Sequence, residues 1–362
     1  MDYAGRQANF QSVLKRNRLD GLLVTHLPNV RYLCGFTGSA GALLVTAAKT
    51  LLFTDGRYKE QARTEVTECR VLIHRKSPLV AAGQWLKAKG KKFGLKALGI
   101  EGQHLSVAER SQLCNVLRSG VQLREAPALI EQARMVKDKE EISRLRAAVN
   151  LGSSLFDVAL KAIRPGVKEV EVAAEIEYAA RRAGAEAMSF ETIIASGLRS
   201  ALPHGRASTA EIPANGFVVC DFGIILAGYC SDMTRTVHVG KPSDDARKMY
   251  EAVREAQQAG LGAVRSAVTV GEVDRAARHQ LARRGLGKYF THSTGHGVGL
   301  EIHEAPRIAA GQTEPLRSGM VITIEPGVYV PSVGGVRIED MVLVTEGGCE
   351  VLTPASKELI VI

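Results

Sequence analysis

Acidic residues interrupt four apolar, strand-forming runs in the C-terminal half of this 362-residue chain. They are Asp221 after FVVC, Asp232 before MTRTVHV, Glu325 after VITI and Glu339 within GVRIEDMVLV. A carboxylate buried without a partner is strongly unfavourable unless it takes up a proton, so each of these acids needs a counter-charge. Any one of them can be a salt-bridged residue at a strand edge. The presence of all four acidic residues in such runs indicates a shared site that holds cations.

Turn signals lie between the two members of each acidic pair. Asp221 and Asp232 are joined by FGIILAGYCS, which contains a Gly-Tyr turn, and Glu325 and Glu339 by a segment with Pro and Gly-Gly. Each pair is therefore predicted to lie side by side across a hairpin. The two hairpins resemble a rough internal repeat, and metal ions are the natural cations for their four acids.

A segment rich in histidine and glycine lies between the two hairpins. Residues 291–306, THSTGHGVGLEIHEAP, contain His292, His296 and His303. The glycines alone are weak evidence, and no Lys-Ser/Thr follows that would indicate a phosphate loop. Imidazole beside carboxylates suits Mn²⁺, Fe²⁺, Co²⁺ or Zn²⁺, and shared carboxylates can bridge two ions about 3.5–4 Å apart. Such a pair of ions activates water, which indicates hydrolysis of an acyl bond.

The hydrophobic pattern predicts two domains. Strands and amphipathic helices alternate through the first ~125 residues; the strands are expected at 21–25, 41–46, 50–54, 69–74 and 93–100, and the helices at 3–18, 57–66 and 80–90. A Pro-containing joint and a long charged helix within 124–148 predict domains of residues 1–126 and 127–362. In the second domain, helices at 167–184, 244–264 and 272–285 are expected to cover an antiparallel sheet.

Charge and composition weigh against several function classes. Residues 1–130 carry 20 Lys and Arg against 9 Asp and Glu, but no aromatic interleaving or helix-turn-helix pattern accompanies them, so a solvated basic surface is preferred to a nucleic-acid site. No apolar stretch approaches the roughly 18 residues needed to cross a bilayer, and the N-terminus lacks a secretory apolar region. Six scattered cysteines without a CxxC pair fit a reducing compartment. We expect a cytoplasmic protein with no nucleic-acid or membrane partner.

The motifs resemble, in order and wording, those of the metal-dependent Xaa-Pro peptidases, aminopeptidase P and prolidase. The similarity is carried by DFG with YCSDMTRT, by HSTGHGVGLEIHE, by ITIEPGVY and by GVRIED. RYLCGFTGSAGALLVT (31–46) and TDGRYKEQA (54–62) resemble the N-terminal domain of the short bacterial members, and SFETIIASG (189–197) and ALPHG (201–205) resemble their substrate wall. The resemblance covers nearly the whole chain. It implies an α/β (α+β) protein in which a creatinase-like N-terminal domain precedes a pita-bread catalytic domain, the fold shared with methionine aminopeptidase and creatinase.

The resemblance implies two divalent metal ions per chain. Their ligands would be five residues that are all present here without substitution: Asp221, Asp232, His296, Glu325 and Glu339. Manganese is the first expectation and cobalt or zinc the alternatives, because all three accept these ligands. Cys230 is expected to pack rather than to bind metal.

The resemblance also implies roles for the residues around the ions. Glu325 would assist proton transfer, His303 would contact the substrate carbonyl or the tetrahedral intermediate, and His204 would bind the substrate and its leaving group. Phe190 would line the proline pocket, and Arg307 and Arg337 would grip the carboxylate end of the substrate.

Structural alternatives stay open for most of these side chains. His303 and His204 can be structural histidines, and His292 is expected to be structural. Arg307 can be a surface arginine, and Arg337 can serve only to neutralise the acidic site.

We therefore expect a hydrolase, a dinuclear-metal exopeptidase that removes the residue before proline from Xaa-Pro-Yaa peptides. A prolidase that cleaves only Xaa-Pro dipeptides is the alternative, because the motifs do not separate the two. An Xaa-Pro bond lacks the N–H that general peptidases bind, so a dedicated pocket for proline-containing di- or oligopeptides is needed. A non-catalytic binding protein on the same fold is a remote alternative, since no ligand is lost, and the large N-terminal domain disfavours a methionine aminopeptidase. The resemblance also implies a homodimer.

Overall fold

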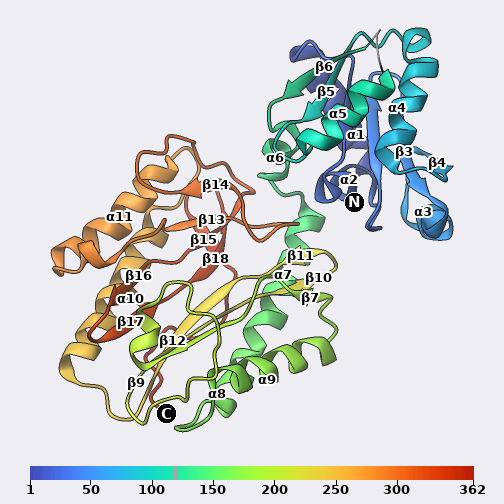
Figure 1. Ribbon diagram of the computed structural model, residues 1–362. Helices are drawn as coiled ribbons and strands as arrows, with labels where there is room; N and C mark the ends of the chain where they lie inside the picture. The colour runs from blue at the N-terminus through green and yellow to red at the C-terminus, as the bar shows by residue number, and fades with distance from the viewer. Residues whose placement is uncertain (118–120) are drawn as a thin grey trace. The chain divides into compact units, whose positions relative to one another are not determined.

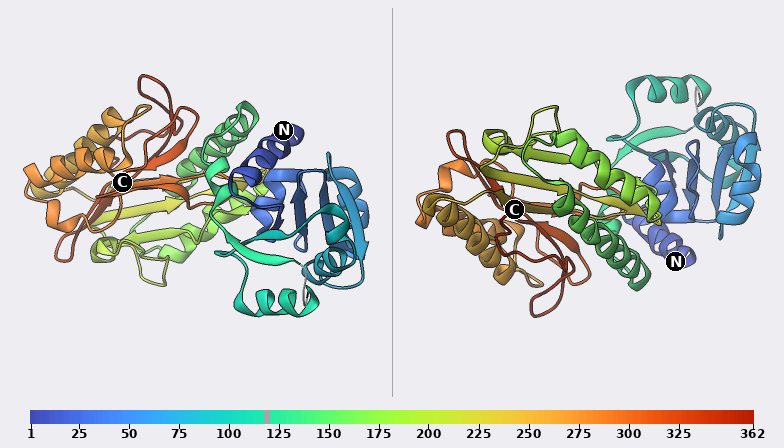
Figure 2. Two further views of the ribbon diagram at one scale, coloured as in Figure 1. Left: turned by 90° about the horizontal axis from the view of Figure 1, so that it is seen from above. Right: turned by 90° about the horizontal axis from the view of Figure 1, so that it is seen from below.

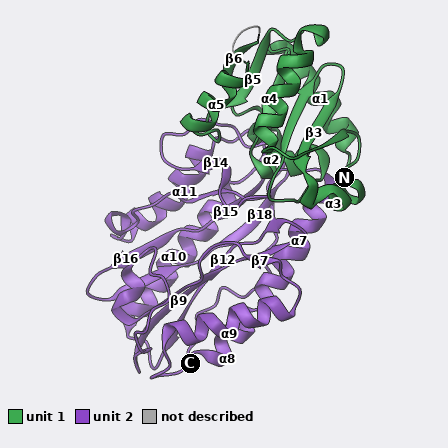
Figure 3. Cartoon of the chain, turned by 45° about the vertical axis from the view of Figure 1, so that its right-hand side comes forward, with its two compact units in different colours: residues 1–134 green, residues 135–362 purple. Residues whose placement is uncertain are grey.

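The computed structural model describes residues 1–117 and 121–362, which form two compact units, Met1–Arg134 and Met135–Ile362 (Figures 1 and 3). The domain limit predicted near residue 127 falls between the last strand and the last helix of the first unit. The assignment of the two domains to residues 1–126 and 127–362 stays a prediction.

The first unit is built on a six-stranded mixed sheet in the order β4-β3-β2-β1-β5-β6. The strands β1, β5 and β6 run parallel, as do β3 and β4, whereas β2 is antiparallel to both of its neighbours. Helices α4 and α5 cover one face through an apolar core. The elements are α1 (Tyr3–Arg16), β1 (Gly21–Val24), α2 (Leu27–Cys34), β2 (Ala42–Thr46), β3 (Thr50–Asp55), α3 (Lys59–Glu65), β4 (Arg70–His74), α4 (Pro78–Lys89), β5 (Ala97–Glu101), α5 (Val107–Leu117), β6 (Gln122–Ala126) and α6 (Leu129–Arg134).

Two predictions for this part of the chain are wrong in their limits. The strand expected at 93–100 begins only at Ala97, because Gly90–Phe93 form a 3-10 turn and Gly94 has a φ of 68°. The joint and long helix expected within 124–148 are a strand, β6, and two helices, α6 and α7 (Lys139–Ser154). The second helix restarts at Lys139, where the Asp138 side chain accepts hydrogen bonds from the first turn and Glu141 completes a capping box.

The described residues of the second unit form four antiparallel sheets, β11-β10-β7, β12-β9-β8, β14-β13-β15-β18-β19 and β16-β17, where one sheet was expected, and helices pack against them as expected (Figures 1 and 2). Helices α8 and α9 pack on the sheet β12-β9-β8, and α10 and α11 pack on strands of the sheet β14-β13-β15-β18-β19 and on the β16–β17 hairpin. The helices are α7 (Lys139–Ser154), α8 (Phe156–Ala162), α9 (Glu169–Arg182), α10 (Asp244–Ala263) and α11 (Val270–Arg283). The strands are β7 (Ala187–Met188), β8 (Ile193–Ser196), β9 (Gly216–Phe222), β10 (Ile224–Leu226), β11 (Tyr229–Cys230), β12 (Met233–Val239), β13 (Gly295–Gly297), β14 (Glu304–Ile308), β15 (Val321–Ile324), β16 (Gly327–Val330), β17 (Gly334–Arg337), β18 (Asp340–Val344) and β19 (Cys349–Val351).

Within the second unit, β12 is joined to the end of β17 and to the segment between β17 and β18. The Glu339 N–H donates to the Thr234 carbonyl (3.1 Å), and the Arg337 N–H donates to the Thr236 hydroxyl (3.1 Å). This seam brings the strands that carry the four acidic residues together. Among the described residues, the helices are too short or too polar to cross a bilayer.

Candidate metal centre and active site

The first acidic pair lies on the β9–β12 hairpin. Asp221 in β9 stands opposite Thr234 in β12, and Asp232 immediately precedes β12. The small β10–β11 hairpin connects the two long strands, so the chain returns to the same end of the sheet. The prediction that Asp221 and Asp232 lie side by side is confirmed, and both side chains are buried.

The second acidic pair follows the same plan on β15 and β18. Glu325 follows β15 and Glu339 precedes β18, and the last paired residues of these strands are Ile324 and Asp340. The β16–β17 hairpin provides the connection. Thr234, from the first pair of strands, donates its hydroxyl to Glu339 Oε2 (2.7 Å), which holds the two pairs together.

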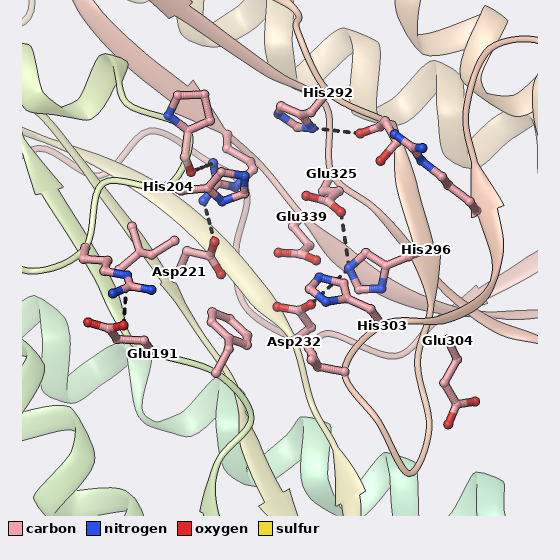
Figure 4. A pocket seen from close by; sticks show the side chains of 18 residues that line it. Glu191, His204, Asp221, Asp232, His292, His296, His303, Glu304, Glu325 and Glu339 are labelled. Carbon is pink, nitrogen blue, oxygen red and sulfur yellow. Dashed lines mark hydrogen bonds and ion pairs between the residues drawn. The ribbon is translucent and has the colours of Figure 1, made fainter. Parts of the chain in front are cut away.

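His296 enters this acidic cluster from β13, the neighbour of β15 (Figure 4). Its Nε2 atom is 3.5 Å from Asp232 Oδ2 and 3.4 Å from Glu325 Oε1. Its Nδ1 atom is 3.0 Å from the Gly297 carbonyl, which can only accept a hydrogen bond. The proton of a neutral ring therefore belongs on Nδ1, and the Nε2 lone pair points into the cluster, as in a metal-binding histidine.

The electrostatics of the cluster fit a divalent metal site. Burial, and then the charge of Glu339, raise the pKa of Asp232 well above its usual value; burial, and then Glu325, do the same for Glu339. Burial also raises the pKa of Glu325 to about 7 and lowers the pKa of His296. Without cations Asp232, Glu325 and Glu339 are thus shifted toward their protonated forms, while the imidazole of His296 stays neutral.

The donor atoms support the same conclusion. Asp221 Oδ1 and Glu339 Oε1 are buried and accept no hydrogen bond within the described structure. One ligand atom from each of Asp232, His296 and Glu339 lies within 4.8 Å of the others, which is close enough to share an ion. Oxygen-rich ligands with one imidazole suit divalent ions such as Mn²⁺, Co²⁺ or Zn²⁺.

Arg337 is the cation that the chain itself places in the cluster. Its side chain is 4% exposed and donates to Asp221 Oδ2 through Nη2. Its other donors reach the Tyr329 hydroxyl (2.6 Å), the Thr234 hydroxyl (3.1 Å) and the Pro203 carbonyl (3.1 Å). Because these contacts occupy four of its five N–H donors, the geometry supports a neutralising role for Arg337 rather than a grip on substrate.

The other predicted site residues line the same cavity, which has a volume of about 690 Å³. His204 and His303 are exposed on its wall, and Phe190 is half-buried. The His303 ring centroid is 4.5 Å from that of His296, and partial burial and the neighbouring His296 lower the pKa of His303. Arg307 is exposed on the wall, and no ion pair is recorded for it among the described side chains. All the predicted residues are thus brought together, whereas their roles remain proposals.

Two further predictions concern residues near the ligands. His292 bonds through Nε2 to the Tyr329 hydroxyl (2.9 Å) and through Nδ1 to the Ser293 carbonyl (2.8 Å), and burial lowers its pKa to about 4. These contacts occupy both ring nitrogens, in agreement with a structural histidine. Cys230 is buried, and this burial raises its thiol pKa to about 12, which disfavours a thiolate ligand.

Several functional partners were not found by sequence reasoning. Tyr329 and Thr234 bond to Arg337, and Thr323 donates to Glu325 Oε1 (3.3 Å) and accepts from the His296 N–H (3.0 Å). Thr323 and Thr234 are polar residues within the apolar runs VITI and MTRTVHV. This position could have marked both threonines from the sequence. For the ion pair of Lys137 with Glu304, 167 positions apart, the sequence offers no local signal.

Comparison with known proteins agrees with this geometry. Residues 143–346 match metallopeptidase family M24, and residues 6–136 match the creatinase/prolidase N-terminal domain. An Xaa-Pro dipeptidase of Pyrococcus horikoshii is 38% identical over 350 residues, which is 96% of each chain. The structure is similar to that of an Xaa-Pro dipeptidase from Bacillus anthracis (TM-score 0.96, 39% identity, 100% of both chains). It is also similar to that of an X-Pro aminopeptidase from Thermotoga maritima (TM-score 0.89, 34% identity, 96% of this chain and 99% of the other).

The family matches cover both units, and the matched catalytic segment contains all four acids and the histidine of the cluster. A creatinase-type N-terminal domain followed by a pita-bread catalytic domain is therefore the architecture of this protein, which belongs to metallopeptidase family M24.

Proposed function

We propose that this protein is an Xaa-Pro dipeptidase, a metal-dependent exopeptidase that hydrolyses the bond between an N-terminal residue and a C-terminal proline. The convergence of Asp221, Asp232, His296, Glu325 and Glu339 on one cavity is the observation that carries the proposal. The names of the relatives favour dipeptidase activity over the aminopeptidase activity that we expected first from the sequence. Several of the relatives and solved structures are Xaa-Pro dipeptidases or prolidases.

The acidic charge of the site supports the binding of divalent ions, and we propose two. Four ionised carboxylates and the Arg337 guanidinium together carry three negative charges. One divalent ion reduces this to one negative charge, and a second makes the site positive. The ions supply Lewis acidity and lower the pKa of bound water when they are present. We propose manganese for both positions, with cobalt or zinc as substitutes.

The residues around the ligands have complementary roles in this proposal. Glu325, whose pKa burial raises to about 7, accepts a proton during attack and returns it to the leaving nitrogen. His303, exposed beside His296, donates a hydrogen bond to the oxygen of the carbonyl under attack. His204 faces the same space from the loop after Pro203 and holds the leaving group.

Arg307 accounts for the preference for a dipeptide. Its guanidinium is exposed on the cavity wall, where it can bind a terminal carboxylate through two parallel hydrogen bonds. In an Xaa-Pro dipeptide this carboxylate belongs to proline itself, whose ring would pack on Phe190. In a longer peptide the charge lies further from the scissile bond.

The remaining features of the proposal concern the assembly and location of the protein. We propose a homodimer in the cytoplasm that acts on proline-containing peptides. The six cysteines are all free in the structure, which accords with a reducing compartment.

Paired substrates test the reaction. Protein freed of metal with a chelator is assayed on an Xaa-Pro dipeptide and on the matched Xaa-Pro-Yaa tripeptide, before and after addition of Mn²⁺. Mn²⁺-dependent turnover of the dipeptide alone is the expected result. A preference for the tripeptide would instead identify an aminopeptidase P, and no turnover of either peptide by protein with two bound ions would contradict the proline specificity.

A further inference from the structure

A buried ion pair lies beside the active cavity and includes none of the predicted metal ligands. Lys137 Nζ is 3.1 Å from Glu304 Oε2, and the two side chains are only 1% and 6% exposed. Glu304 follows His303 directly and lines the same cavity. Removing one partner of a buried pair leaves an uncompensated charge, which is strongly unfavourable, so the two side chains depend on each other.

The backbone on both sides of Lys137 is fixed. Its N–H donates to the Gly319 carbonyl (2.9 Å), and the neighbouring Val136 forms an antiparallel bridge with Met320, the residue before β15. On its other side, Asp138 caps helix α7. The ammonium group is therefore presented from an ordered segment of the second unit.

The Glu304 carboxylate organises residues 298–304, which we call the His303 loop. Its Oε1 atom accepts the Glu301 N–H (3.2 Å), while its Oε2 atom faces Lys137. A Cβ atom on Gly299 would lie 2.6 Å from either carboxylate oxygen, so the carboxylate packs directly on the Gly299 backbone. The loop is therefore folded around a carboxylate whose charge is balanced by Lys137.

The same pairing turns Glu304 away from the candidate metal ligands. Figure 4 shows the Glu304 carboxylate pointing away from Asp232, His296 and Glu339. Its backbone stands opposite Gly297, the residue after His296. A carboxylate without a counter-charge at this position would be attracted toward cations at the metal ligands. The ion pair with Lys137 weakens that attraction.

We propose that Lys137 is a positioning residue that acts through Glu304 to hold His303 in place. The inference rests on the proposed function, in which His303 bonds to the carbonyl oxygen as charge develops there. Without Lys137 the carboxylate loses its counter-charge, the His303 loop loosens and the imidazole moves from its productive position. Because the bond to this oxygen strengthens toward the transition state, the loss falls on kcat more than on KM.

The first test does not depend on activity. Hydrogen exchange of the His303 loop is measured by mass spectrometry in metal-free wild type, Lys137→Met and Glu304→Gln. Arg199→Met is the matched control, because Arg199 is paired with the fully buried Glu169 (3.0 Å), outside the loop. We expect exchange in the loop to be about tenfold faster in both variants of the pair and unchanged in the control. Unchanged exchange in both variants of the pair would overturn the inference.

The second test uses Mn²⁺-loaded protein and an Xaa-Pro dipeptide. Lys137→Met should lower kcat about 10- to 100-fold and change KM by less than about threefold, while Lys137→Arg recovers most of the loss. The double variant Lys137→Met with Glu304→Gln should be no worse than the poorer single variant, because the pair acts as a unit. A kcat loss of less than about threefold in Lys137→Met would refute the positioning role. If Lys137→Met does not fold, the same kinetic measurement on Glu304→Gln tests the inference.

The two tests separate the two proposals. An inactive wild type would contradict the proposed reaction, and faster exchange in the variants would still support control of the loop by Lys137. An active wild type with unchanged exchange in both variants would refute only the positioning role.

Discussion

Replacing Glu325 by Gln is expected to stabilise the metal-free protein at high pH. The Glu325 side chain is 16% exposed, and its pKa rises from 4.5 in an unfolded chain to about 7 in the folded protein, chiefly through burial. Between these values the folded state binds more protons than the unfolded state, so stability falls as pH rises through this window. The shift corresponds to about 3 kcal/mol once the pH exceeds 7. Glutamine keeps the shape of the side chain without the charge and avoids this penalty.

Thermal denaturation in the presence of a chelator measures this effect. Wild type and Glu325→Gln should unfold at similar temperatures at pH 5, where the carboxyl is protonated. By pH 8 the variant should be more stable by about 3 kcal/mol, or roughly 6–12 °C for a unit of this size. Added Mn²⁺ should reverse the order, because it binds the ionised carboxylate of the wild type. Glu346→Gln, at an exposed position in the same unit, is the control and should not change the profile. Parallel wild-type and Glu325→Gln profiles from pH 5 to 8 would refute the reasoning.

Three further predictions concern metal and substrate. Asp232→Ala or Glu339→Ala should abolish metal loading and turnover while circular dichroism shows an intact fold; metal content equal to wild type would remove these residues from the ligand set. His303→Ala should lower kcat about 10²–10³-fold with a small change in KM, as for loss of an oxyanion donor, and an effect confined to KM would contradict that role. Arg307→Met should raise KM for an Xaa-Pro dipeptide by at least about tenfold but spare its amidated analogue, and equal losses on both would exclude a carboxylate contact.

The four acids could be predicted from the sequence because each interrupts an apolar run that admits few explanations. The turn signals between them were enough to predict the two pairs, and the structure confirms their proximity. The break between α6 and α7 was missed because good helix formers surround Asp138, so only the folded cap reveals the boundary. The partners of Arg337 were also missed, since Asp221 lies 116 positions away and their contact depends on how the two sheets meet.

The placement of the fixed cations explains how an acidic site of this kind can remain folded and still bind metal. A fixed cation close to the ligands lowers the repulsion among them, but it also repels the incoming ions. Arg337 provides one such charge and directs it to Asp221 Oδ2, while Asp221 Oδ1 accepts no hydrogen bond from the described residues and remains available to an ion. Another buried cation, Lys137, is paired instead with Glu304, whose carboxylate points away from the cluster. Once ionised, the four carboxylates and Arg337 together carry three net negative charges, which favours the binding of divalent ions, while the Glu304 carboxylate serves the order of the His303 loop.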